Sequence, residues 1–331
     1  ARPVVPQPDS WTTAKLSVAR SFLAATSVKS KAFFAGGFDG DVLNAVDIYD
    51  AATNSWTTGN LSVPRWDLAA TSVGSKAFFA GGLGLVHADW KVVDIYDAIT
   101  NTWSTAKLSA GRYYLAATSV GSKALFAGGI SENSSAVDIY DFRSNSWSTA
   151  SLSLGRYKLA ATSVGSKALF AGGTVCCGQN QQSIVDIYDV DTNDWTTANL
   201  SVARFGLAAT SVGSKALFAG GRDLTSDPPT LFNVVDIYDV VTNNWTTANL
   251  SLARYDLVAT TVGTKAFFAG GTWMGYGISN VVDIYDSVTN TWTSAKLSAE
   301  RSNLAAASVG NKALFAGGAG PGPMSVVDIY S

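Results

Sequence analysis

The sequence predicts an all-β protein, a seven-bladed β-propeller of four-stranded antiparallel blades. One observation is that the letters "KALFAGG" or "KAFFAGG" occur seven times along the 331 residues, and another is that a tryptophan recurs every 44–50 residues. In addition, no segment carries the apolar stripe of a helix. Four-stranded units that repeat at this period are typical of propellers, in which each blade buries its faces against its neighbours. The repeated tryptophans are Trp11, Trp56, Trp103, Trp147, Trp195, Trp245 and Trp292.

One copy of the repeat illustrates the four expected strands. The first, "LAATSV" (115–120), has the small residues that suit a crowded position, and "KALFAGG" (123–129) is the second. The third, "AVDIYD" (136–141), alternates apolar and polar residues as a half-buried strand does. The fourth is "SWSTASLS" (146–153). The sequences "VGSK" and "DFRSN" between them are rich in turn-forming residues.

The two ends of the chain predict how the ring closes. Residues 1–10 contain three prolines and are expected to form an extended segment close to polyproline II, and residues 11–331 form a single propeller. Residues 11–17 are a fourth strand without the preceding three, whereas residues 301–330 supply three strands without a fourth. The N-terminal strand is therefore expected to complete the last blade, which removes an exposed sheet edge.

Several residues of each copy resemble the kelch motif. These are the Gly-Gly that ends a hydrophobic strand, a Tyr and a Trp separated by six residues, as in Tyr49 and Trp56, and an Arg that opens each first strand. The resemblance extends from Trp11 to Tyr330 and implies a kelch-type seven-bladed propeller. The arginines are Arg20, Arg65, Arg112, Arg156, Arg204, Arg254 and Arg301.

The composition argues against several functional classes. The net charge is −2, so neither nucleic acid nor an anionic membrane is an expected partner. No apolar run approaches the roughly 20 residues that cross a bilayer, which predicts no membrane insertion. His87 is the only histidine and there are two glutamates, whereas a zinc-type metal site takes three or four ligands. The ligand sets of catalytic kelch relatives cannot be assembled, so we expect no catalytic residues, metal or cofactor.

Variation between the copies is confined to one place. The strands of a blade are named a to d from the axis to the rim, and only the b–c connection, between "GG" and "VDIY", changes in length. In an antiparallel blade the b–c and d–a connections share one face, on which function is expected because functional residues concentrate on loops carried by a rigid scaffold. Candidate binding residues on this face are Trp66, Tyr113, Tyr157, Phe205 and Tyr255, each of which follows a repeat Arg, and Trp90, Trp273 and Tyr276 in the loops.

Both the aromatic side chains and the arginines allow a structural interpretation. The aromatic residues could form a stacking platform for a sugar or a peptide, or they could pack beneath the b–c loops. The arginines could form an anion site, or each could bond the backbone or an Asp of its own blade. Identical placement in every blade favours the internal role for the arginines.

Two further motifs concern the compartment of the protein. Cys176 and Cys177 are adjacent, and their Cα atoms would lie about 3.8 Å apart, below the usual disulfide span. A strained vicinal disulfide, two free thiols and a bond to a partner chain all remain open. The start at Ala1 and the glycosylation sequons predict a secreted protein at the cell surface or outside the cell. The glycosylation candidates are Asn60, Asn133, Asn199 and Asn249.

These observations predict a non-enzymatic extracellular scaffold that presents its variable loops to other protein subunits. The partners include copies of the chain itself, which would assemble into a filament or a surface layer by docking residues 1–10 on the loops of a neighbour. The alternative is a monomeric module that recognises a glycan or a peptide. An enzyme is the least favoured class.

Overall fold

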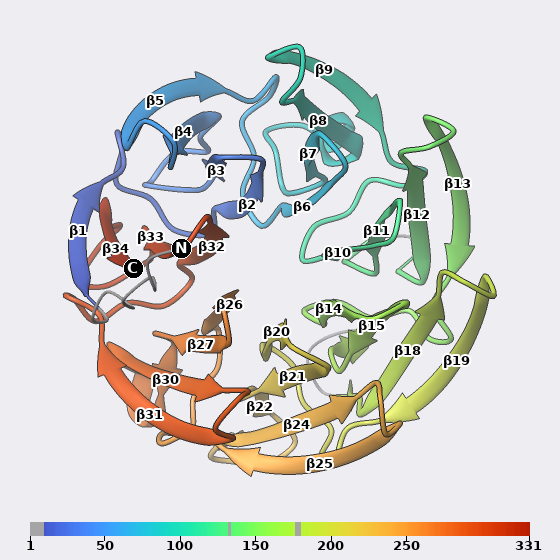
Figure 1. Ribbon diagram of the computed structural model, residues 1–331, viewed down its shortest axis with the longest axis vertical. Coiled ribbons are helices and arrows are strands. Elements are labelled where there is room, and N and C mark those ends of the chain that lie inside the picture. The colour runs from blue at the N-terminus through green and yellow to red at the C-terminus, as the bar shows by residue number, and fades with distance from the viewer. Residues whose placement is uncertain (1–9, 132–133, 176–179) are drawn as a thin grey trace, which may run out of the picture.

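A computed structural model describes residues 10–131, 134–175 and 180–331. Seven four-stranded antiparallel sheets form a closed ring around one axis, with strand a of each blade nearest the axis and strand d at the rim (Figure 1). This confirms the predicted seven-bladed propeller. Neither of the two short helices in the described part of the chain could cross a membrane, since they have only five and three residues.

The blades are numbered along the chain, and their strands are given in the order a, b, c, d. Blade 1 comprises β2 (Ala24–Val28), β3 (Lys31–Ala35), β4 (Ala45–Asp50) and β5 (Ser55–Asn60); blade 2 comprises β6 (Ala69–Val73), β7 (Lys76–Ala80), β8 (Val92–Asp97) and β9 (Thr102–Lys107). Blade 3 comprises β10 (Ala116–Val120), β11 (Lys123–Ala127), β12 (Ala136–Asp141) and β13 (Ser146–Ser151); blade 4 comprises β14 (Ala160–Val164), β15 (Lys167–Ala171), β18 (Ile184–Asp189) and β19 (Asp194–Asn199). Blade 5 comprises β20 (Ala208–Val212), β21 (Lys215–Ala219), β24 (Val234–Asp239) and β25 (Asn244–Asn249); blade 6 comprises β26 (Val258–Val262), β27 (Lys265–Ala269), β30 (Val281–Asp286) and β31 (Thr291–Lys296). Blade 7 comprises β32 (Ala305–Val309), β33 (Lys312–Ala316), β34 (Val326–Tyr330) and β1 (Trp11–Lys15).

Blade 7 is built from both ends of the chain, as predicted. Strand β1 pairs with β34 in an antiparallel register that runs from Trp11 opposite Tyr330 to Lys15 opposite Val326. The backbones of Ser10 and Ser331 exchange two hydrogen bonds of 3.0 Å beyond the ladder. The first and last described residues of the ring therefore lie side by side, and the ring has no open blade.

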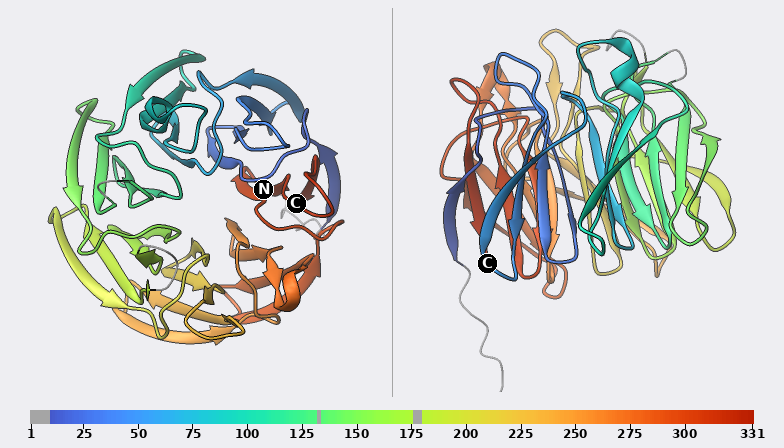
Figure 2. Two further views of the ribbon diagram at one scale, coloured as in Figure 1. Left: turned by 180° about the vertical axis from the view of Figure 1, so that it is seen from behind. Right: turned by 90° about the horizontal axis from the view of Figure 1, so that it is seen from above.

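The two faces of the ring differ in the way the sequence predicts. Hydrogen bonds join b–c to d–a connections, for example from Leu61 N–H to the Asn44 carbonyl at 2.8 Å, so these connections share one face. We call it the variable face, and the opposite one, formed by the a–b and c–d turns, the turn face. Figure 2 shows the longer loops gathered at one end of the barrel-shaped molecule. These loops carry the 3-10 turns η1 (His87–Lys91) and η2 (Met274–Tyr276) and three short hairpins, β16 (Thr174–Val175) with β17 (Asn180–Gln181), β22 (Arg222–Asp223) with β23 (Thr230–Leu231), and β28 (Thr272–Trp273) with β29 (Gly277–Ile278).

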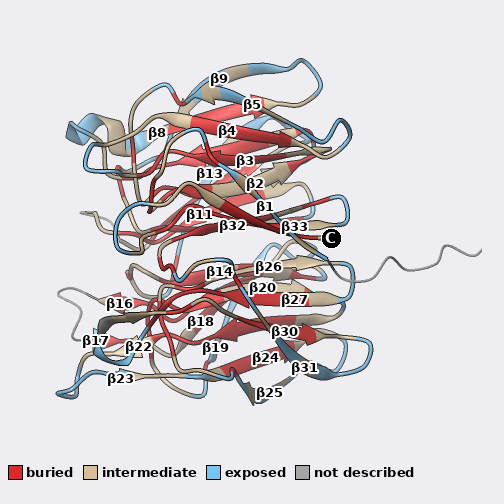
Figure 3. Ribbon diagram, turned by 90° about the vertical axis from the view of Figure 1, so that its left-hand side faces the viewer, coloured by how far each residue is buried: buried red, intermediate tan, exposed pale blue. Residues whose placement is uncertain are grey.

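The hydrophobic core lies between neighbouring blades. In one cluster Phe33 and Ile48 of blade 1 pack against Phe79 and Tyr96 of blade 2, and all four are buried. Figure 3 shows burial concentrated in the inner strands and exposure along the connections and outer strands. The repeat tryptophans of strand d are only partly buried; Trp103, for instance, covers the outer edge of this same cluster. The same apolar residues recur in each blade because the spaces between neighbouring blades are alike.

The repeated Gly-Gly has a geometric cause. Gly36 and Gly37 have φ angles of 67° and 115°, which favour glycine. A Cβ atom at Gly36 would lie 2.4 Å from the carbonyl oxygen of Arg65, and the Gly37 N–H donates to that same carbonyl at 2.8 Å. Strand b must therefore end in two glycines so that its backbone can touch the segment that enters the next blade.

Candidate functional site

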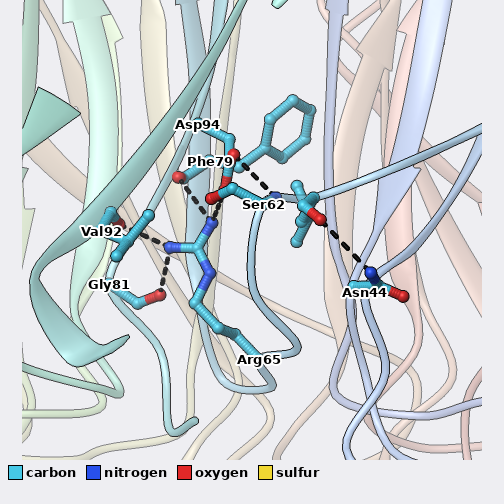
Figure 4. Close-up of polar contacts among 8 residues, drawn as sticks. Asn44, Ser62, Arg65, Phe79, Gly81, Val92 and Asp94 are labelled. Atoms are coloured by element: carbon cyan, nitrogen blue, oxygen red, sulfur yellow. Dashed lines mark hydrogen bonds and ion pairs between the residues drawn. The ribbon is translucent and has the colours of Figure 1, made fainter. Parts of the chain in front are cut away.

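The repeat arginines have the internal role that their regular placement favours. All seven are fully buried, and each forms an ion pair with the Asp of "VDIY" in its own blade. Figure 4 shows the guanidinium of Arg65 bonded to Asp94 and to backbone carbonyls that include Gly81 at 2.9 Å. The Asp94 carboxylate also accepts a hydrogen bond of 2.9 Å from the N–H of Ser62, in the segment that leaves blade 1. The pair therefore connects two blades and is not available to a ligand.

The aromatic residues that follow these arginines lie at the base of the b–c loops. Each forms an isolated β-bridge to the first loop residue of its blade, as Trp66 does to Leu83. Phe205 and Tyr255 are buried, and the guanidinium of Arg222 lies 4.9 and 4.0 Å from their ring centroids. The other three, Trp66, Tyr113 and Tyr157, are partly exposed.

The structure brings some of the predicted aromatic residues together and separates others. Trp90, carried by η1, packs against Tyr113 with ring centroids 5.3 Å apart, and Tyr114 connects Tyr113 to Tyr157. Trp66 instead packs between two phenylalanines of blade 1. Trp273 lies in blade 6 with 42% of its surface exposed, and Tyr276 ends the η2 turn of the same loop. Their role in binding stays a prediction.

A second position after each arginine forms a closed ring that sequence analysis did not single out. All seven residues there have left-handed φ angles of 51–66°. The N–H of each donates to the carbonyl of its counterpart in the preceding blade at 2.8–3.2 Å, and Phe22 of blade 1 donates to Asn303 of blade 7. The members are Phe22, Asp67, Tyr114, Lys158, Gly206, Asp256 and Asn303. The left-handed backbone is unfavourable for six of these residues, so the ring must be held by its hydrogen bonds and by the packing beneath it.

The side chains of this ring line a cavity of about 210 Å³ at the axis, which we call the channel mouth. Its floor is the leucine that follows each ring residue, for example Leu68 and Leu115. A second space of about 270 Å³ is lined only by leucines, alanines and one valine. Chemically diverse side chains therefore line the channel mouth, whereas those of the second space are apolar.

Charged groups of the channel mouth interact across the blades. The Lys158 ammonium lies 3.8 Å from Asp256 Oδ1 and 4.6 Å from the centroid of the Tyr114 ring. Burial raises the pKa of Asp67 to about 7, an effect that the Tyr114 hydroxyl and Lys158 oppose and Asp256 strengthens. Burial and the Asp67 carboxylate together raise the pKa of Tyr114. The carboxyl group of Asp67 thus changes its charge near neutral pH.

A signal for the channel mouth is present in the sequence. Across the seven copies, the second residue after Arg is Phe, Asp, Tyr, Lys, Gly, Asp and Asn. The residues that follow it, such as "LAATSV" (115–120), are nearly the same in every copy. The first letter after Arg varies as well, and only that position is among the binding candidates predicted from the sequence. Comparing the copies column by column would have identified both.

Some of the remaining predicted sites lie among the described residues and others do not. Asn60, Asn199 and Asn249 are exposed at the ends of outer strands, where the variable face begins. Asn133, Cys176 and Cys177 lie outside the described residues, as does the segment 1–9. Within the part of the chain that the structure describes, no three His, Cys, Asp or Glu side chains gather in a way that could hold a metal ion.

Comparisons with known proteins agree with this architecture. A model of the kelch motif matches residues 19–60 and 253–296, which correspond to blades 1 and 6. No curated protein matches the chain. Among solved structures, one described as the structure of YjhT is similar, with a TM-score of 0.68 and 16% identity over 85% of this chain and 99% of that chain. The chain is therefore a seven-bladed β-propeller in which two blades match the kelch motif.

Proposed function

We propose that the chain is a non-enzymatic, extracellular scaffold protein whose variable face binds other protein subunits. Kelch propellers are typically protein-interaction scaffolds. The observation that carries the proposal is the contrast between the faces, because the turn face repeats nearly the same residues in every blade. All differences in loop length, and the added hairpins and 3-10 turns, lie on the variable face. A rigid scaffold with diverse loops on one side is suited to recognition.

Exposed apolar side chains support this choice of face. Leu85 with Val86, and Trp273 with Met274, form adjacent pairs on the variable face with 42–75% of their surface exposed. On the turn face, exposed aliphatic residues such as Val241 and Val288 occur singly, one to a c–d turn. Single exposed apolar residues are ordinary on soluble proteins, whereas grouped ones more often mark contacts.

We further propose that copies of the chain associate through the N-terminal segment. Ser10 lies beside Ser331, which follows a strand that ends on the turn face. A segment that leaves one copy there and docks on the variable face of another makes a head-to-tail contact, and such contacts propagate as filaments unless they close a ring. The exposed sequons Asn60, Asn199 and Asn249 support an extracellular location, where they would carry glycans.

Two changes should weaken this association without affecting the fold. The first is Trp273→Ser together with Met274→Ser, and the second is deletion of residues 1–9. Each removes contacts at the proposed interface, and we expect dissociation constants to rise roughly tenfold or more. Sedimentation velocity at several protein concentrations measures the effect.

The matched control is Val241→Ser with Val288→Ser, which removes similarly exposed apolar side chains from the turn face. The control should associate like the parent protein. A parent that stays monomeric at every concentration would contradict self-association, and equal behaviour of the two double variants would contradict the assignment to the variable face.

The channel mouth gives specific support to the alternative, a monomeric recognition module. It combines the aromatic side chains of Phe22 and Tyr114 with polar groups around one hollow, as small-ligand sites do. Binding on a glycan array by a protein that remains monomeric would favour this alternative over the scaffold.

A further inference from the structure

We propose that the channel mouth binds an alkylammonium group, with the Asp67 carboxylate as its counter-charge. This inference does not rest on the proposed scaffold function. It follows from the charge balance, the shape and the lining of the cavity, and it identifies a cationic ligand where the sequence indicated only aromatic surfaces.

The charge balance leaves one carboxylate, that of Asp67, without an ion pair among the described residues, because the group that hydrogen-bonds it is the neutral Tyr114 hydroxyl. The charged residues that line the channel mouth are Asp67, Lys158 and Asp256. Lys158 and Asp256 face each other at 3.8 Å and offset each other's charge. Oδ2 of Asp67 is buried and has no hydrogen-bond partner among the described residues. Because a buried carboxylate without an adjacent counter-charge is unfavourable, a bound cation would stabilise the ionised form of Asp67.

Lys158 already shows how this cavity accommodates an ammonium group. Its Nζ lies 4.6 Å from the centroid of the Tyr114 ring, a distance typical of cation–π contacts, and close to the Asp256 carboxylate. The approach of Lys158 to Asp256 crosses blade 5, where Gly206 has no side chain. A Cβ atom at Gly206 would lie 3.0 Å from Asp256 Oδ1. The charge of Lys158 also acts on the second carboxylate, Asp67, but the two form no ion pair within the described part of the chain.

The surroundings of Asp67 fit a short alkyl chain that ends in an ammonium group. Phe22 and Tyr114, on the blades to either side, offer aromatic surfaces to a cation, and Leu68 and Leu115 form an apolar floor for methylene groups. The cavity has a volume of about 210 Å³. This volume lies below the roughly 300–1,000 Å³ of most ligand pockets, so the group that enters is small.

The pH dependence of binding follows from the ionisation of Asp67. The groups that face it are Tyr114, Lys158 and Asp256, and its pKa is raised to about 7. A cation binds the ionised carboxylate, whereas protonation at lower pH removes the counter-charge. Alkylammonium groups, with a pKa near about 10.4, stay charged across this range. Binding should therefore weaken about tenfold from pH 8 to pH 6, as the ionised fraction of Asp67 falls from about 0.9 to about 0.1.

The test uses the full chain and n-butylammonium chloride as the probe, at constant ionic strength, in a ligand-observed NMR titration. A probe with so few atoms is expected to bind with a roughly millimolar dissociation constant at pH 8. Butan-1-ol and butyrate, which have the same length but no positive charge, should bind at least tenfold more weakly. Binding of butan-1-ol as tight as that of butylammonium would overturn the proposal.

Three variants separate the site from general electrostatics. Asp67→Asn should weaken butylammonium binding at least tenfold at pH 8 and abolish its pH dependence. Lys158→Met should strengthen binding several-fold, because it leaves two unpaired carboxylates. Asp223→Asn removes a carboxylate from a b–c loop of the same face and should have little effect. If Asp67→Asn does not fold, the opposite response of Lys158→Met and the pH profile remain decisive. Weaker binding by Lys158→Met, or an equal effect of Asp223→Asn, would overturn the proposal.

The ammonium could come from a free small amine or from a lysine side chain of a partner, and a competition experiment distinguishes these sources. If saturating butylammonium reduces the self-association of the parent protein, a lysine of the neighbouring copy is the natural occupant. If association is unchanged while butylammonium binds, the occupant is a free amine. The titration alone tests the ammonium site, so its failure and that of the scaffold function can be told apart.

Discussion

Replacing Asp94 with Ala is expected to lower the free energy of unfolding by about 3–5 kcal/mol, the cost of breaking a buried ion pair from one side. The Arg65 guanidinium is fully buried, and Asp94 is its counter-charge. Burial lowers the pKa of Arg65 to about 10, and the Asp94 carboxylate opposes that shift. The change also removes the acceptor for the Ser62 N–H. Urea denaturation of the variant and the parent protein measures the difference.

Asp97→Ala is the matched control, since it removes the same residue type from the same strand, β8. Asp97 pairs with Lys76 at 2.9 Å, but both side chains are about one fifth exposed. Partly exposed pairs contribute little, so the cost should stay below about 1.5 kcal/mol even with the loss of the hydrogen bonds from Ser75 and Ile99 in the two adjacent turns. If the two variants unfold at the same urea concentration, the buried pair is not the stronger connection.

Deleting residues 1–16 should destabilise the ring or make it aggregate. The deletion removes β1 and leaves the backbone of β34 unpaired along one edge, and exposed edges promote association. It also removes the Trp11 ring from its contacts with Phe315 and Tyr330, and the buried side chain of Leu16. Truncating one buried leucine costs about 2–5 kcal/mol, and the deletion should lower the free energy of unfolding by at least as much. Thermal melting and light scattering measure both effects.

Two controls separate ring closure from the mere loss of residues. Deletion of residues 1–9 keeps β1 and should melt like the parent protein. A synthetic peptide of residues 10–17 added to the longer deletion should restore melting by pairing with β34 as an added strand. A longer deletion that melts like the parent and does not aggregate would mean that β1 does not close the ring.

The fold was predictable because the same residue types fill the space between each pair of neighbouring blades. Phe79 and Ile48 fill one inter-blade space, and their equivalents fill the others, so the same letters recur at the same offsets. The requirement for Gly36 and Gly37 comes from the close approach of Arg65 in the next blade. Repetition therefore predicts the strands, the two faces and closure by residues 11–17, of which the structure has Trp11–Lys15 as the strand.

Only part of the candidate site was predictable from the sequence. The position of Trp66 and its equivalents on the variable face followed from antiparallel topology. The channel mouth did not, because its residues are far apart in the sequence and meet only through the seven-fold ring of backbone hydrogen bonds. Lys158 faces Asp256 across Gly206 because the left-handed backbone sets the directions of their side chains. The sequence of a single repeat does not reveal these directions. The burial of Phe205 and Tyr255 beside Arg222 likewise results from packing in the folded protein.

Hydrogen–deuterium exchange on the associated protein tests most directly that the variable face is the interaction surface. The comparison is between the parent protein under associating conditions and the Trp273→Ser, Met274→Ser variant at the same concentration. Slower exchange is expected in the parent for the exposed loops 83–92 and 272–281, with the outer strands unchanged. Equal exchange of both loops in the two samples, with protection confined to outer strands such as β9 and β25, would contradict it.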